Sequence, residues 1–427
     1  MKRFRLIAFL TALCVFCSCV PVLAEDTVAD TSEQALIESD AFYALGTMDL
    51  LTEDFLNIGA GSAVTRAQFL GALYKLTGLP GGTADVILPF DDVNENTPHR
   101  DAISYFYGIG AVSGSGSNTF EPDSKITYIQ AVKIISDFLG YKLYVRECLG
   151  AYPMGYLLMA ERLDLGYGIE VGDINSHICA EALIRLIYNS ANVPLLEAEI
   201  YNDKGEIVSY SSDKDRTLLS VYNSIYYRED ILQDNGVVSL DGNSSEPGKV
   251  VIGGKKFRSA DFDLTDYLGM EISFFYRSTD EADTVLWACP NDYNDILTVK
   301  SADLIKDDPS YGVSRIVYYE NERRKTVLID EFADIVYNNA LSNDASAEYL
   351  KPQAGELKLI DNDGDRDYDI VIVKDFRNIY VNAVFSNSIT KSPLLSTYIS
   401  HGYIPNAMYI RCLSTLFTLI TFVGSYS

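Results

Sequence analysis

One helix-like stretch occurs three times in the first half of this 427-residue chain, and this repetition limits the fold more than any other feature. The copies are VTRAQFLGALYKLTGL from Val64, ITYIQAVKIISDFLGY from Ile126 and ICAEALIRLIYNSANV from Ile178. A second short helical stretch and a glycine-bearing loop precede each copy. Such a unit cannot bury its apolar stripe alone, so we expect the three units to pack into one domain.

The three helices differ in how well their first residues can cap them. Thr65 stands at the N-cap of the first copy and Gln68 follows three residues later, a pattern that predicts a capping box. Thr127 and Gln130 repeat this pattern in the second copy. In the third copy Cys179 replaces the threonine, and we expect it to cap poorly.

Each copy also carries one apolar stripe with helical spacing, which predicts the face that is buried. The stripes consist of Phe69, Leu73 and Leu76, of Val132, Ile135 and Phe138, and of Leu183, Leu186 and Ile187.

The N-terminus is typical of a secreted protein. Residues 1–24 combine Lys2, Arg3 and Arg5 with an apolar run and a small-residue cleavage site, which predicts a signal peptide. Without it, 31 basic residues face 60 acidic ones, a net charge of −29. A surface this acidic repels nucleic acid, so we exclude nucleic acid as a partner.

The repeats resemble S-layer homology (SLH) domains of Gram-positive surface proteins. The resemblance covers residues 35–195 and depends on VTRAQF, on FDDV at residues 90–93, on the SGSGSNTFEPDSKIT loop and on IRLIYNSANVPL. It implies repeats at 35–82, 90–145 and 150–195. It also implies a pseudo-threefold all-α bundle that binds pyruvylated secondary cell-wall polysaccharide without a covalent link, and hence a location at the cell wall or S-layer.

The same resemblance implies which residues bind the polymer. Its threonine-arginine-acid motif falls on Thr65, Arg66 and Gln68, and Asp92 belongs to the FDDV segment. The cation is absent from the other copies, where Tyr128 and Ala180 stand. One alternative is therefore that the repeats act only as a scaffold and that Arg66 is a solvated residue of a first helical turn. The sequence leaves open whether the chains also assemble with one another on the cell surface.

The second half predicts a different architecture. Residues 196–217 are polar without an apolar period and are interpreted as a linker. Residues 218–385 hold short strand-like runs, which predict an all-β barrel or sandwich, with a hairpin turn near Glu320 to Arg323. The expected fold class is thus a multidomain α + β chain.

An acidic turn in this region predicts a structural calcium site. The segment DNDGDRDYD places Asp361, Asp363, Asp365, Asp367 and Asp369 at alternate positions. Calcium prefers oxygen ligands, and the expected set is four side chains together with the Asp367 carbonyl. A turn that only faces solvent is the alternative.

No catalytic motif is recognisable, so we predict a protein without enzymatic activity; a wall-attached carbohydrate-active hydrolase that uses acidic residues of the β-rich domain is the alternative. Residues 386–427 contain no Asp or Glu. This atypical apolar tail is interpreted as non-native or poorly ordered rather than as a membrane anchor.

Overall fold

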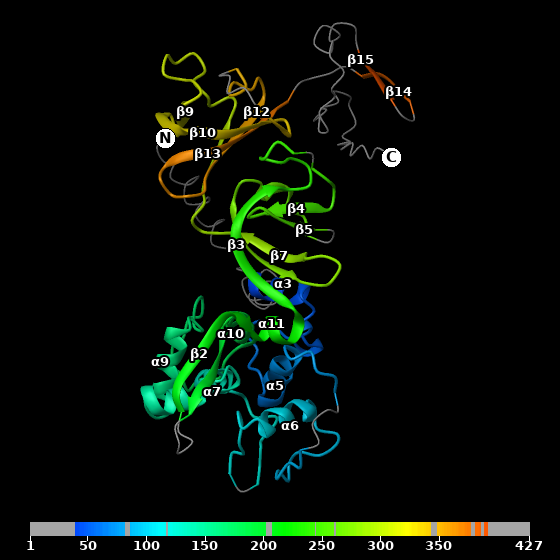
Figure 1. Ribbon diagram of the computed structural model, residues 1–427, viewed down its shortest axis with the longest axis vertical. Coiled ribbons are helices and arrows are strands. Elements are labelled where there is room, and N and C mark those ends of the chain that lie inside the picture. The colour runs from blue at the N-terminus through cyan, green and yellow to red at the C-terminus, as the bar shows by residue number, and fades with distance from the viewer. Residues whose placement is uncertain are drawn as a thin grey trace, which may run out of the picture. The chain divides into compact units, whose positions relative to one another are not determined.

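The computed structural model divides the chain into two compact units, Met1–Asn223 and Ser224–Ser427 (Figure 1). It describes residues 39–81, 86–116, 118–201, 207–243, 245–259, 262–342, 348–376, 381–385 and 388–391. The expected signal peptide lies outside the described residues, and so does the tail after residue 391. Among the described helices, none has the length and apolar character that a membrane crossing requires.

Helices dominate the first unit. They are α3 (Asp40–Thr47), α4 (Glu53–Leu56), α5 (Arg66–Lys75), α6 (Arg100–Gly108), α7 (Tyr128–Phe138), α8 (Lys142–Tyr144), the π-helical turn η1 (Val145–Leu149), α9 (Met154–Arg162), α10 (Ala180–Ala191) and α11 (Leu218–Asn223). All nine side chains of the three predicted stripes are buried, which confirms the predicted core faces of α5, α7 and α10.

The residues just before α5, α7 and α10 form a closed ring of backbone hydrogen bonds. The Val64 N–H donates to the Ile178 carbonyl (3.4 Å), the Ile178 N–H to Ile126 (3.1 Å), and the Ile126 N–H to Val64 (3.0 Å). Each copy therefore contacts both others in the same way, and the three segments are equivalent by position as well as by sequence.

Each helix start also rests on the loop of the next copy. The Arg66 N–H donates to Ser124 (2.9 Å), the Tyr128 N–H to Ser176 (3.2 Å) and the Ala180 N–H to Ser62 (2.9 Å). The first turn of a helix leaves backbone N–H groups without intrahelical partners, and these loop carbonyls satisfy some of them. As a result, a glycine-bearing loop lies over the start of each helix.

The segment expected to be a linker is a hairpin. Strands β1 (Pro194–Tyr201) and β2 (Ile207–Thr217) pair antiparallel. The prediction from the polar sequence was wrong because the backbone hydrogen bonds of a two-stranded ribbon need no apolar face. The Tyr141 hydroxyl donates to the Pro194 carbonyl (2.9 Å) and fixes this hairpin to the helical unit. The first unit is therefore not all-α.

Strands dominate the second unit. They are β3 (Ile225–Asp234), β4 (Lys249–Ile252), β5 (Lys255–Arg258), β6 (Glu271–Arg277), β7 (Thr284–Pro290), β8 (Asp295–Lys300), β9 (Arg315–Glu320), β10 (Arg323–Tyr337), β11 (Ala340–Leu341), β12 (Gly355–Asp361), β13 (Asp367–Asp375), β14 (Val381–Phe385) and β15 (Ser388–Lys391), with the 3-10 turn η2 at Thr265–Tyr267.

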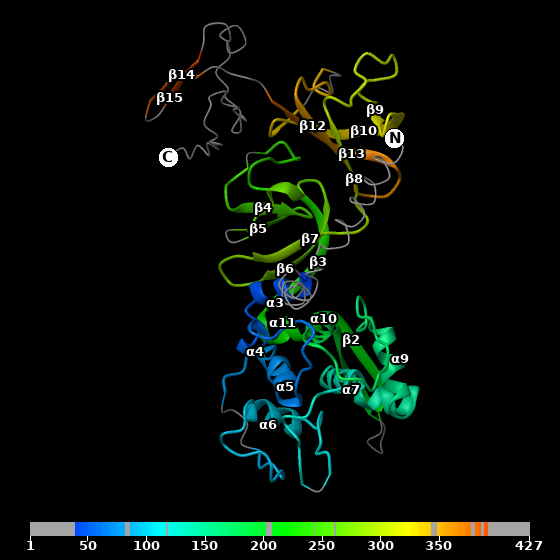
Figure 2. The same cartoon turned by 180° about the vertical axis from the view of Figure 1, so that it is seen from behind.

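The first five strands close into a barrel in the order β3-β4-β5-β7-β6 (Figure 2). β5 and β7 run parallel, whereas the other pairs are antiparallel. The expected β barrel is thus present in this unit.

Strands β8 to β13 build a six-stranded sheet in the order β11-β10-β13-β12-β8, with β9 paired to the first half of β10, and β14 and β15 pair antiparallel in a separate two-stranded sheet. The predicted hairpin is confirmed, because Glu320 of β9 pairs with Arg323 of β10. Ile360 and Ile370 extend from this sheet into the core of the barrel. The β12–β13 turn is thereby held against the barrel.

Candidate functional site

Two regions hold the predicted site residues: the start of α5, and the turn between β12 and β13. At α5 the predicted capping box is confirmed. The Gln68 N–H donates to Thr65 Oγ1 (3.1 Å), and the Thr65 N–H donates to Gln68 Oε1 (3.0 Å). Both side-chain oxygens are thus engaged in the cap, and Thr65 and Gln68 position the helix start.

Arg66 is the first helical residue after this cap, and its side chain lies on the loop of the second copy. The guanidinium carbon is 4.6 Å from the centre of the Phe120 ring, and Nε donates to the Phe120 carbonyl (3.2 Å). Burial lowers the pKa of Arg66, while the nearby Glu121 carboxylate acts in the opposite direction. Arg66 is therefore a packed, partly desolvated cation and not simply a solvated one.

Asp92 holds the loop on which Arg66 rests. Its Oδ1 accepts the Phe120 N–H (2.8 Å), and its Oδ2 accepts the Glu121 N–H (2.7 Å). Burial acts to raise the pKa of Asp92, but these backbone hydrogen bonds outweigh it, and the pKa lies below its usual value. Both oxygens are already used within the protein, so the geometry makes Asp92 a positioning residue.

Glu121 completes the site and was missed by the sequence analysis. Its carboxylate accepts hydrogen bonds from Ser115 Oγ (2.9 Å) and Ser124 Oγ (3.1 Å). These bonds fix the acid whose charge acts to raise the pKa of Arg66, although no ion pair forms between the two in the described part of the chain. An anion that approaches Arg66 therefore meets a cation whose surroundings are already ordered.

The corresponding positions of the other copies carry no cation, as the sequence indicated. Tyr128 at the start of α7 is 8 % exposed, and burial raises its pKa. Ala180 at the start of α10 is fully buried. The second capping box forms between Thr127 and Gln130, whereas Cys179 makes no side-chain cap.

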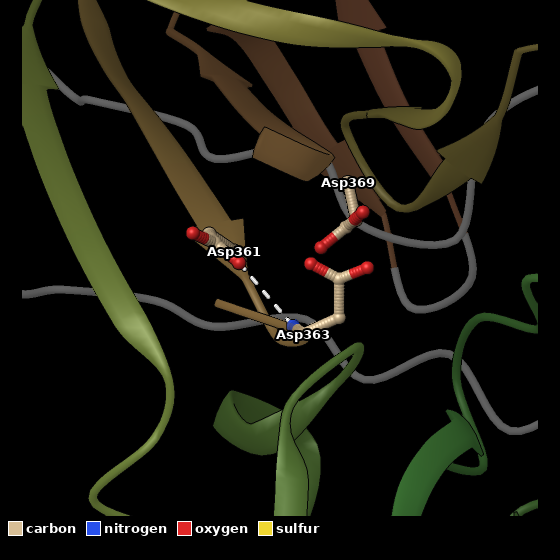
Figure 3. A group of neighbouring side chains, drawn as sticks. All are labelled: Asp361, Asp363 and Asp369. Carbon is tan, nitrogen blue, oxygen red and sulfur yellow. Dashed lines mark hydrogen bonds between the residues drawn. The ribbon is translucent and has the colours of Figure 1, made fainter. Parts of the chain in front are cut away.

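The acidic turn brings together three of the five predicted aspartates. Carboxylate oxygens of Asp361, Asp363 and Asp369 lie within 4.8 Å of one another (Figure 3). Asp365 and Asp367 do not belong to this group. Asp365 Oδ1 accepts the Asp367 N–H (2.8 Å), and Asp367 was expected to contribute its backbone carbonyl rather than its carboxylate.

Asp361 organises this turn from a buried position. It is 2 % exposed, and its carboxylate accepts the N–H groups of Asp363 (3.2 Å), Gly364 (2.7 Å) and Arg366 (3.0 Å). Asn362 Nδ2 donates to the Gly269 carbonyl of the barrel (2.8 Å). The three carboxylates are therefore presented by a turn that is fixed at both sides.

The electrostatics of the turn suit a cation. The pKa of Asp369 is raised, first by burial and then by the charges of Asp363, Asp361 and Asp365, against the effect of the Asn362 N–H. Three oxygen ligands that repel one another fit a hard divalent ion such as calcium, and the remaining ligands would be backbone oxygens and water.

Comparison with known proteins points to the bacterial surface. The family described as the S-layer homology domain matches residues 89–132, a segment that contains Asp92, Phe120 and the cap of α7 but not Arg66. A "Cell surface protein" of Thermoanaerobacter kivui is 22 % identical over 361 residues, which is 80 % of this chain and 43 % of the relative.

Two further relatives come from Brevibacillus. The "Surface layer protein" of Brevibacillus choshinensis is 25 % identical over 240 residues, or 54 % of this chain and 20 % of the relative. The "Middle cell wall protein" of Brevibacillus brevis is 22 % identical over 251 residues, or 54 % and 23 %. The chain thus spans less than half the length of these relatives. All three names describe surface or wall proteins and none describes an enzyme.

Proposed function

Since this chain is a secreted, wall-associated surface protein that carries an S-layer homology domain, we propose that its helical unit attaches it non-covalently to secondary cell-wall polysaccharide. The observation that carries this proposal is the environment of Arg66. The cation lies against Phe120, and no acidic oxygen of the described residues lies within ion-pair distance of it. An anionic sugar of the polymer would supply the missing partner.

The arrangement of the three copies supports the same function. We propose that they are three S-layer homology repeats in a pseudo-threefold bundle, because their ring of backbone bonds relates them equally. In this proposal the first repeat holds the polymer through Arg66, and the others complete the bundle. The β-rich unit is then displayed at the surface without enzymatic activity.

The test is co-sedimentation of the secreted chain with protein-free Gram-positive cell walls, before and after acid extraction of the secondary polymer. We expect binding to untreated walls, none to extracted walls, and about tenfold weaker binding for Arg66→Gln, since one charge-assisted contact is lost. Arg162→Gln is the matched control, because Arg162 is an exposed arginine of the same unit that contacts Tyr144 (3.1 Å).

Equal binding to extracted walls would exclude the polymer as the partner, and unchanged binding of Arg66→Gln would exclude Arg66. Tubes without walls are the blank. Pelleting in them would show that the chains assemble with one another, a partnership that belongs to the same proposal.

The acidic turn is assigned a second role within this proposal, as a structural calcium site with Asp361, Asp363 and Asp369 as ligands. The support is the approach of three carboxylates on a turn that is fixed to the barrel. The bound ion would relieve their mutual repulsion and stabilise the folded state by mass action.

Calcium titration calorimetry on two exposed, isosteric variants tests this ligand set. Asp363→Asn removes one of the three converging carboxylates and is expected to weaken binding at least about tenfold. Asp365→Asn removes the same charge outside the group and is expected to leave affinity within about twofold. Equal losses in both variants would favour the larger set of four aspartate side chains with the Asp367 carbonyl, and no heat of binding at millimolar calcium would refute the site.

A further inference from the structure

The junction between the second and third copies has its own cation, although Tyr128 stands where the first copy has Arg66. The Tyr128 N–H bonds to Ser176 (3.2 Å) and the Ile129 N–H to Ile174 (3.0 Å), so the loop of the third copy covers the start of α7. This loop begins after α9 with Leu165, and two glycines follow closely, Gly166 and Gly168. The glycine part of the loop borders both Tyr128 and a second arginine.

That arginine is Arg185 of α10, which is half-buried. A Cβ atom built on Gly168 would lie 3.8 Å from both Cδ and Nε of Arg185. A Cβ on Gly166 would lie 3.1 Å from the Tyr128 hydroxyl. Two residues of chain reach at most about 7 Å. The guanidinium and the phenol hydroxyl therefore flank one short glycine segment.

The loop and the arginine are held by the same helix. Asn189 Nδ2 donates to the Leu165 carbonyl (2.9 Å) and to the Tyr167 carbonyl (2.9 Å), one helical turn beyond Arg185. Tyr167 stands between the two glycines in the sequence and is 70 % exposed. Arg185 thus borders a loop that two hydrogen bonds hold in place, so a ligand that binds there has less of the loop's conformational entropy to overcome.

The charge of Arg185 is not neutralised within the described residues. No carboxylate there comes within ion-pair distance of it, although the chain contains 60 Asp and Glu. Its only described ring contact is the Tyr188 ring centre at 5.9 Å. Arg66 has the same combination of ring contact, glycine-bearing loop and missing acid partner. An arginine in this situation can bind a carboxylate through two parallel N–H donors.

We propose that Arg185, with Tyr128 and Tyr167 beside it, forms a second anion subsite that takes a carboxylate-bearing sugar of the wall polymer. The subsite replaces, from the third copy, the cation that the second copy lacks at its helix start. This inference rests on the proposed attachment to the wall polymer. Two subsites on one unit would hold one polymer chain, or two, more tightly than either alone.

The test compares Arg185→Gln, Arg66→Gln and the double variant of the secreted chain, with Arg162→Gln as the control. The probes are the acid-released wall polymer and the same polymer after chemical reduction of its carboxyl groups to alcohols. We expect about fivefold weaker binding of the native polymer by Arg185→Gln, a larger loss in the double variant, and no loss in the control.

The reduced polymer separates an anion contact from a structural role. If Arg185 binds a carboxylate, the difference between the native chain and Arg185→Gln disappears on the reduced polymer, and the melting temperature of the variant is unchanged. Full affinity of Arg185→Gln, or a loss that persists on the reduced polymer, would overturn the subsite while leaving the Arg66 attachment intact. Failure of the native chain to bind any polymer would refute the attachment itself.

Discussion

The two oxygens of Asp92 decide the shape of the loop under Arg66, and their effect can be followed by pH. A carboxylate whose pKa is lower in the folded than in the unfolded state contributes stability above its unfolded value, about 3.9, and this contribution is lost as the pH falls. We expect Asp92→Asn to reduce stability at neutral pH and to flatten the loss of stability as the pH falls below about 4. Melting curves of both proteins across this range test the prediction. Parallel pH profiles would contradict it.

The role of Asp92 in holding the loop could not be predicted from the sequence. Its partners are the backbone N–H groups of Phe120 and Glu121, which lie 28 and 29 residues away. Because nearly every residue type has such an N–H group, the sequence does not indicate which one a carboxylate will bind. Arg66 was recognisable from its place after a capping threonine, but its contact with the Phe120 ring was not. In the acidic turn the alternation of aspartates predicted four side-chain ligands and the Asp367 carbonyl, whereas the folding of the turn brings three of those four carboxylates together.

The helix starts allow a prediction at the scale of the element. Thr127 accepts the Gln130 N–H in α7, whereas Cys179 caps nothing in α10. An N-cap threonine contributes about 1 kcal/mol, so Thr127→Ala is expected to destabilise the helical unit by about this amount. Cys179→Thr is expected to stabilise it by up to about 1 kcal/mol. Urea unfolding followed by far-ultraviolet circular dichroism gives both values, and a Cys179→Thr variant of unchanged stability would show that the third start needs no cap.

Elements were predictable from the sequence where their signals are local. The capping boxes and the apolar stripes involve residues within one or two turns, and the structure confirms them. The β9–β10 hairpin was equally visible, because alternation and turn residues occur together. The β1–β2 hairpin was not, since its strands pair through backbone groups and carry polar side chains. The sequence predicted an all-β barrel or sandwich but not the order of its strands, because that order depends on pairings between strands far apart in the sequence.

At the scale of the whole molecule, the division at Asn223 predicts two separate unfolding events. Each unit has its own buried core, and chains with several domains commonly depart from two-state unfolding. In calorimetry of the secreted chain we expect two unfolding transitions. Calcium should raise the midpoint temperature of only one of them, the transition of the β-rich unit. Asp363→Asn should abolish this shift, whereas Arg66→Gln should leave both transitions in place. A single transition that moves as a whole with calcium would disprove this independence.

The end of the helical unit has a mechanical consequence. Asn223 is its last residue, and its Nδ2 donates to the Leu76 carbonyl at the end of α5 (2.7 Å). Tension on the β-rich unit, such as fluid shear at a cell surface, therefore enters the helical unit beside α5, the helix whose opposite end carries Arg66. If Arg66 holds the polymer as proposed, this force would pass along α5 from the chain exit at Asn223 to the polymer contact.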